Sequence, residues 1–132
     1  MFRLRVAEKF DAAHKLVGYK GKCSQLHGHT WNVEVFIVGK ELDEIGMLAD
    51  FTFLKKKLRE VTKRLDHCYL NDNLEIGNPT SENISKFIFE KFGNLSEGLI
   101  LESVRVWESP ESWCEYFENK QFHSKVTSTA DR

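Results

Sequence analysis

The stretch Cys23-Ser-Gln-Leu-His27-Gly-His29-Thr30 places a thiol and two imidazoles close together in the chain. Residues two apart on an extended chain point to the same face, so His27 and His29 can reach one metal ion. A third histidine, His14, ends the earlier segment Phe10-Asp-Ala-Ala-His14. Three histidines with an open fourth position are typical of catalytic zinc. The pattern therefore predicts a Zn(II) cofactor bound by His14, His27 and His29.

Cys23 has two possible roles in such a site. As a fourth protein ligand it would close the coordination sphere and make the site structural. As a free thiolate beside the metal it would be available as a base or nucleophile. Spacing alone does not separate these roles, and an isolated His-x-His pair can also occur by chance on an exposed strand. The further presence of His14 and Cys23 favours the metal site over the chance pair.

Alternating apolar residues predict two strands that carry the histidines. In residues 2–14 the apolar positions share one parity, and His14 has that parity too. A second strand is predicted over 28–39, where Trp31 and the aliphatic residues after it share the parity of His27 and His29. Antiparallel pairing of these strands would bring all three imidazoles together at one end of the sheet.

The rest of the chain predicts two helices. Asp50 is suited to cap the first helix, and Thr80 or Ser81 the second, which ends at Gly93. Apolar residues three and four apart give each helix one buried stripe. The stripe of the first helix contains Phe51, Leu54, Leu58, Val61 and Leu65.

Two more strands complete the predicted sheet. Residues 99–108 form the third strand, and residues 113–117 a short fourth. In the third strand one parity holds Ile100, Val104, Val106 and Glu108, with Glu102 interrupting the apolar run. The pattern predicts an α+β domain over residues 1–117, followed by a polar tail, 118–132, that we expect to be partly disordered.

Composition excludes several classes of protein. With 132 residues and a net charge of −1, the chain is long enough for one domain and shows no basic excess that would favour nucleic acid. No apolar run approaches the roughly 20 residues of a membrane span, and the charged N-terminus is not a signal peptide. Cys23, Cys68 and Cys114 are odd in number and widely spaced, which favours a reduced, cytoplasmic compartment over a disulfide framework.

Two further groups could carry chemistry. In Asp66-His67, a carboxylate adjacent to an imidazole can orient it and make it a general acid or base; alternatively, the histidine only interacts with the end of the first helix. Glu108 has the parity of buried residues, so it is either a solvated carboxylate at a strand end or an anchor. As an anchor it would accept paired N–H groups of a ligand such as a pterin or guanine ring.

The chain resembles the 6-pyruvoyltetrahydropterin synthase family over about residues 2–117. Within it, the chain is most similar to the branch that makes 6-carboxytetrahydropterin for queuosine. The resemblance is carried by Phe10-Asp-Ala-Ala-His14, Cys23-x-x-x-His27-Gly-His29, Gly46-Met-Leu-Ala-Asp50-Phe51, Leu65-Asp66-His67-x-Tyr69-Leu70-Asn71, Asn78-Pro-Thr80-Ser-Glu82-Asn83 and Val106-Trp-Glu108-Ser. Together, in this order, these motifs are specific to the family.

The resemblance implies a tunnelling fold (T-fold): a four-stranded antiparallel sheet with two helices on one side, with subunits joined into a barrel as a homohexamer of two stacked trimers. It also implies roles for the site residues. His14, His27 and His29 correspond to the zinc ligands, Cys23 to the catalytic base and Asp66 with His67 to the proton relay. Glu108 corresponds to the pterin anchor, and Thr80 and Ser81 lie in the segment that lines the pterin pocket.

The implied reaction is zinc-dependent conversion of 7,8-dihydroneopterin triphosphate to 6-carboxy-5,6,7,8-tetrahydropterin, with release of acetaldehyde and triphosphate. The three residues between Cys23 and His27 match this branch, whereas animal pyruvoyl synthases have a longer insertion there. Family members that release hydroxymethyl pterin have a glutamate in this loop, which Ser24-Gln25-Leu26 lacks. Two alternatives remain, a 6-pyruvoyltetrahydropterin synthase and a non-catalytic zinc-stabilised binding module. We further expect the pocket to lie between subunits.

Overall fold

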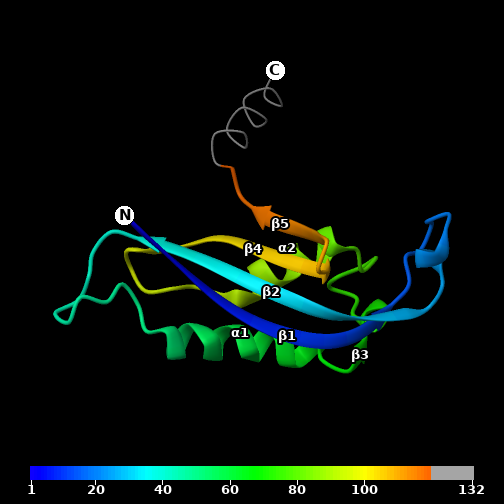
Figure 1. Cartoon of the computed structure of the whole chain (residues 1–132), viewed down its shortest axis with the longest axis horizontal. Helices are drawn as coiled ribbons and strands as arrows, with labels where there is room; N and C mark the ends of the chain where they lie inside the picture. The colour runs from blue at the N-terminus through cyan, green and yellow to red at the C-terminus, as the bar shows by residue number, and fades with distance from the viewer. Residues whose placement is uncertain (120–132) are drawn as a thin grey trace, which may run out of the picture.

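The computed structural model describes residues 1–119, and these form one layer of strands and one layer of helices (Figure 1). The helices and strands, in chain order, are β1 Phe2–His14, β2 His27–Gly39, α1 Phe51–Leu65, β3 Cys68–Tyr69, α2 Ser81–Phe92, β4 Leu99–Ser109 and β5 Ser112–Phe117. Two short 3-10 turns are also present, η1 at Lys22–Ser24 and η2 at Leu70–Asp72. The predicted α+β class is confirmed.

The sheet has five strands in the order β3-β1-β2-β4-β5. β1 and β2 pair antiparallel over their whole length, from Phe2 opposite Gly39 to His14 opposite His27. The prediction of four antiparallel strands was wrong in one respect, because β3 adds a fifth strand that runs parallel to β1. With only two residues, β3 is too short to show an alternating pattern in the sequence.

Both helices cover the same face of the sheet. α1 packs against β1, while α2 packs against β4 and β5 and also contacts α1 (Figure 1). The side chains of Asp50 and Thr80 cap them, accepting from the backbone N–H of Thr52 and Asn83 respectively. The core between the layers contains Trp31, Ile37, Leu54, Leu58, Ile84 and Ile88, each less than 2% exposed. Burial of these apolar surfaces is the main force that holds the helices on the sheet.

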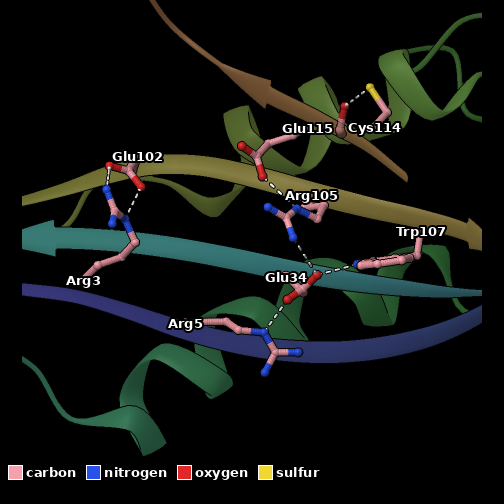
Figure 2. A network of polar contacts seen from close by, with 9 residues as sticks. Arg3, Arg5, Glu34, Glu102, Arg105, Trp107, Cys114 and Glu115 are labelled. Carbon is pink, nitrogen blue, oxygen red and sulfur yellow. Dashed lines mark hydrogen bonds and ion pairs between the residues drawn. The ribbon is translucent and has the colours of Figure 1, made fainter. Parts of the chain in front are cut away.

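The opposite face of the sheet carries charged side chains in place of a helix layer. Figure 2 shows ion pairs that cross β1, β2, β4 and β5, with the helices behind the strands. Glu34 of β2 lies at their centre and is only 7% exposed. It accepts hydrogen bonds from Arg5 and from the indole N–H of Trp107, and Arg105 lies 3.8 Å away. The two faces of the sheet therefore differ in chemistry.

A bulge in β4 shifts the side-chain parity of the third predicted strand. Phe36 pairs with Ser103 but the next residue, Ile37, pairs with Leu101, so Glu102 is left over. An extra residue turns the preceding side chains to the other face. Ile100, predicted to share the buried parity of Val104, is instead 56% exposed.

The helix prediction needs a smaller correction, because Phe51 is 49% exposed although its spacing fits the buried stripe of α1. Phe51 is the first residue of α1, at the end of the helix where the apolar stripe does not yet face the sheet. Of the predicted tail, residues 120–132 lie outside the described part of the chain. In the described part, no helix is both long enough and apolar enough to cross a membrane.

Candidate metal centre and catalytic groups

The three predicted metal ligands meet at the paired ends of β1 and β2. His14 is the last residue of β1, and it lies opposite His27, the first residue of β2. His14 Nε2 is 2.9 Å from His27 Nε2, and the His29 ring centroid is 5.2 Å and 4.8 Å from the centroids of the other two rings. The parity argument made from the sequence thus agrees with the observed convergence of the three rings, and the rings of His14 and His29 also lie beside the buried Trp31, at 5.0 Å and 5.1 Å between centroids.

Backbone carbonyls set which ring nitrogen of each imidazole is free. His14 Nδ1 lies 2.8 Å from the Pro79 carbonyl oxygen, and His27 Nδ1 lies 2.7 Å from that of Gln25. A carbonyl oxygen only accepts, so both Nδ1 atoms carry the proton and both Nε2 atoms present a lone pair. Such outer hydrogen bonds are typical of histidines that bind metals.

The free nitrogens fit a bound cation. Two lone pairs that face each other at 2.9 Å repel unless a cation or a proton lies between them. His29 Nε2 is buried and has no hydrogen-bond partner of suitable geometry, although a Glu108 oxygen lies 3.1 Å away. Burial lowers the pKa of His14 and of His29, which favours the neutral form that a metal requires. The donor set of neutral nitrogens is one that zinc prefers.

Glu108 lies beside the histidines. Its Oε1 is 3.1 Å from His29 Nε2, and the Ser81 hydroxyl donates to its Oε2 over 3.2 Å. The carboxylate is half-buried, as its parity predicted. Its contact with Ser81 agrees with the expected pterin pocket, whereas its contact with His29 was not predicted. Thr80 uses its hydroxyl oxygen to cap α2, accepting from the Asn83 N–H over 3.1 Å.

Cys23 lies outside this group. Among the described residues, the candidate ligands whose donor atoms lie within 4.8 Å of one another here are His14, His27, His29 and Glu108. Cys23 sits in η1, half-buried, and its carbonyl accepts from the Leu16 N–H over 2.8 Å. This geometry argues against Cys23 as a fourth metal ligand and leaves its thiol available for another role.

Asp66 and His67 form a separate cluster at the β3 edge of the sheet. His67 Nδ1 is 2.9 Å from Asp66 Oδ2, and the Asp66 Oδ1 atom accepts the backbone N–H of Asp11 over 2.9 Å. These hydrogen bonds, that of Asp11 foremost, hold the pKa of Asp66 below its ordinary value. His67, whose side chain is 79% exposed, adopts a positive φ of 57° and is well placed to meet a molecule from solution.

An open depression on the sheet is lined by His67 and by one member of the histidine cluster, His29. Gly28 and Thr30 also line it. Reasoning from the sequence missed Asp11, whose backbone holds the dyad and whose carboxylate accepts from the Thr30 hydroxyl. Its position opposite Thr30 on paired strands was the signal available for that contact.

Comparison with known proteins agrees with this geometry. A family model described as 6-pyruvoyl tetrahydropterin synthase matches residues 3–119. The chain is 43% identical to the 6-carboxy-5,6,7,8-tetrahydropterin synthase of Synechocystis sp., covering 82% of this chain and 87% of that protein. It is 34% identical to the protein of the same name from Haemophilus influenzae, covering 89% of this chain and 100% of that one.

Solved structures show the same architecture. The 6-pyruvoyl tetrahydropterin synthase of Caenorhabditis elegans superposes with a TM-score of 0.77 at 28% identity, covering 89% of this chain and 96% of that one. The Plasmodium vivax 6-pyruvoyl tetrahydropterin synthase has the same fold, with a TM-score of 0.70 at 23% identity and coverage of 89% and 98%. The chain described here therefore belongs to the 6-pyruvoyl tetrahydropterin synthase family.

Proposed function

We propose that this protein is a zinc-dependent lyase. It converts 7,8-dihydroneopterin triphosphate to 6-carboxy-5,6,7,8-tetrahydropterin and releases acetaldehyde and triphosphate. The observation that carries the proposal is the convergence of His14, His27 and His29, with the Nδ1 atoms of His14 and His27 held by carbonyls. The names of the relatives from Synechocystis and Haemophilus support the carboxy-synthase branch.

Each group has a role that follows from its chemistry. A zinc ion at the three histidines would supply Lewis-acid polarisation of the substrate's side-chain hydroxyls. Cys23, as a thiolate, accepts a proton from the side-chain carbon. His67, oriented by Asp66, returns a proton elsewhere on the substrate. Triphosphate then leaves by elimination, which requires no redox cofactor. Water adds to the remaining side chain and the bond between its first and second carbons breaks, which leaves a carboxylate on the pterin and releases the other two carbons as acetaldehyde.

Glu108 is the proposed anchor for the pterin ring. A pterin presents its N3–H and 2-amino N–H side by side, and a carboxylate can accept both. Ser81 already donates to one oxygen of Glu108, which restrains the carboxylate. Thr80 and Ser81 lie at the start of α2, so we assign them to the lining of the pterin pocket.

The proposal extends to the setting of the enzyme. The product belongs to queuosine (7-deazaguanine) biosynthesis, a cytoplasmic pathway compatible with three free cysteines in the described residues. Assembly is proposed as a homohexamer of two trimers whose sheets join into barrels. The ion-paired face of the sheet is compatible with a hydrated barrel interior.

A 6-pyruvoyltetrahydropterin synthase is the second candidate, favoured by the structural likeness to the Caenorhabditis elegans enzyme. The non-catalytic binding module is less well supported, because Cys23 is not part of the histidine cluster. Incubation with 7,8-dihydroneopterin triphosphate, followed by mass analysis, separates these classes. Acetaldehyde supports the lyase, a retained three-carbon side chain supports the pyruvoyl synthase, and recovery of unchanged substrate contradicts both.

The variant Cys23→Ala tests the role of the thiol. If Cys23 is the essential base, the variant keeps its zinc and loses turnover by more than about a hundredfold. If Cys23 is instead a ligand, the variant releases zinc and loses stability. Zinc content and turnover measured on the same preparation distinguish the two, with Cys114→Ala as a matched control.

A further inference from the structure

After His14, where β1 ends, two side-chain amides hydrogen-bond to the backbone of residues 15 and 17 in place of a strand partner. The Lys15 N–H donates to Asn71 Oδ1, and Asn71 Nδ2 donates back to the Lys15 carbonyl, both over 2.9 Å. Two residues later, the Val17 N–H donates to Asn78 Oδ1 over 3.0 Å, and Asn78 Nδ2 donates to the Val17 carbonyl over 3.2 Å. Each asparagine thus binds both backbone groups of one residue.

The backbone of Leu16, between these two contacts, hydrogen-bonds to a different partner. The Leu16 N–H donates to the Cys23 carbonyl over 2.8 Å. Residues 15 and 17 therefore bond to the asparagines, and residue 16 between them bonds to Cys23. Cys23 is therefore one hydrogen bond away from a segment that both asparagines hold.

Both asparagines lie in segments that contact the core or α2. Asn71 lies in η2, next to Leu70, which is 1% exposed. The Asn78 carbonyl accepts from Asn83 Nδ2 of α2 over 2.8 Å. The next residue, Pro79, provides the carbonyl that orients His14. Residues 78–79 therefore contact α2, the proposed metal ligand His14 and Val17. Val17 lies near the start of the Cys23 loop, residues 15–25.

We propose that Asn71 and Asn78 are positioning residues that hold Cys23 in register with the three histidines. The proposal rests on the proposed function of Cys23 as base. Only a side-chain amide offers the donor and the acceptor that each contact uses. Aspartate would keep the acceptor but place its second oxygen against a backbone carbonyl oxygen, and these two acceptors repel. Alanine would remove both hydrogen bonds. Loss of either asparagine would let the loop from Lys15 to Gln25 move away from the metal centre.

The test uses the full-length, zinc-loaded protein and the variants Asn71→Ala, Asn78→Ala and Asn78→Asp. Two properties are measured, turnover of 7,8-dihydroneopterin triphosphate and the rate at which iodoacetamide alkylates Cys23, followed by peptide mass mapping. We expect kcat to fall about tenfold or more with little change in KM, because a small misplacement of a reacting group is costly. Alkylation of Cys23 should accelerate about fivefold or more as the loop opens.

Asn73→Ala is the matched control, since Asn73 caps a nearby turn by accepting the Glu75 N–H and is not bonded to the Cys23 loop. It should leave both measured rates close to those of the wild type. An unchanged kcat or an unchanged alkylation rate in Asn71→Ala and Asn78→Ala overturns the proposal, as does an equal effect in Asn73→Ala. If the wild type fails to turn over the pterin while the variants still accelerate alkylation, the proposed function fails and the anchoring of the loop stands.

Discussion

At the scale of single residues, hydrogen bonds orient the histidines of the candidate metal centre. His14 and His27 each use one ring nitrogen in a hydrogen bond to a backbone carbonyl, which leaves the other nitrogen directed at its neighbours. Neutral imidazoles arranged in this way have unfavourable lone-pair contacts in the folded protein. A divalent cation would convert those contacts into bonds, so binding should be strong and should depend on all three rings.

Replacing His14, His27 or His29 with alanine should therefore abolish retention of zinc. Two remaining nitrogens cannot provide the three protein ligands typical of a catalytic site. Metal content after exhaustive dialysis is the measurement. His67→Ala serves as a control because His67 belongs to the other cluster, and it should retain a full complement of zinc. Zinc retained in the His29→Ala variant would contradict the assignment.

Glu108→Gln should weaken pterin binding while zinc stays in place. The amide offers one acceptor and places a donor pair opposite the donors of the pterin, which we expect to cost about tenfold or more in affinity. Titration of biopterin into wild type and variant measures the change. Glu111→Gln, on the exposed turn that follows β4, is a charge-matched control and should bind as the wild type does. Equal affinity of wild type and Glu108→Gln would remove Glu108 from the site.

At the scale of secondary-structure elements, ion pairs connect the strands on the face away from the helices (Figure 2). Arg3 pairs with Glu102 over 2.6 Å across strands β1 and β4 of the sheet, and Arg105 pairs with Glu115 over 2.8 Å. The Arg3–Glu102 pair is exposed and contributes little to stability. Glu34 differs because it is buried and accepts from both Arg5 and Trp107. Replacing the carboxylate with an amide would keep one acceptor and leave one of these two donors facing an NH2 group.

The variant Glu34→Gln should lose about 1–3 kcal/mol of unfolding free energy near neutral pH. Burial would raise the pKa of Glu34, but hydrogen bonds from Trp107 and Arg5 and the nearby charges hold the pKa below its ordinary value. A lowered pKa stabilises the fold above the unfolded-state pKa, about 4.3, and this contribution is lost as the pH falls through the folded-state pKa.

Urea unfolding of wild type and Glu34→Gln across this pH range measures the effect. The difference between the two proteins should shrink as the solution becomes acidic. Glu102→Gln removes an equal charge from an exposed pair and should cost far less at every pH. A difference that grows toward acid pH would show that the sign of this argument is wrong.

At the scale of the whole molecule, the edges of the sheet are the natural places for subunits to meet. β3 and β5 are the edge strands, and β5 exposes Trp113 and Phe117 at 48% and 58%. An open edge offers unpaired backbone groups to another chain. The dyad of Asp66 and His67 lies at the β3 edge, so a neighbouring subunit could bring it to the metal centre of the next chain.

Co-assembly of two inactive variants tests whether the pocket is shared. Cys23→Ala and His67→Ala should each be inactive when produced alone. If the base and the dyad of one pocket come from different chains, mixed oligomers contain some pockets with both groups intact, and part of the activity returns. Turnover of the co-expressed pair is compared with that of the separately produced variants. Absence of recovery in confirmed mixed oligomers, or full activity in a monomer, would rule out the shared pocket.

Features that repeat over a few residues could be predicted without the structure. Alternation with a period of two marked β1 and β2 and placed His14, His27 and His29 on their buried face, while three- and four-residue steps marked both helices. The cap Asp50 was likewise predicted, and for the second helix the choice narrowed to Thr80 or Ser81, because a cap acts on backbone groups two or three residues away; the structure has Thr80. Local chemistry is sufficient for such features.

Only the tertiary structure decided what depends on contacts between distant segments. The parallel pairing of β3 with β1, the bulge that turns Ile100 outward and the contact of Glu108 with His29 have no local pattern. The two asparagine contacts are of the same kind, since Lys15 and Asn71 are 56 residues apart. A hydrogen bond between side chain and backbone becomes predictable only once the register of the strands has fixed which residues are neighbours. Local patterns therefore identified the three histidines that converge, and the packing of the sheet determines which other groups contact them.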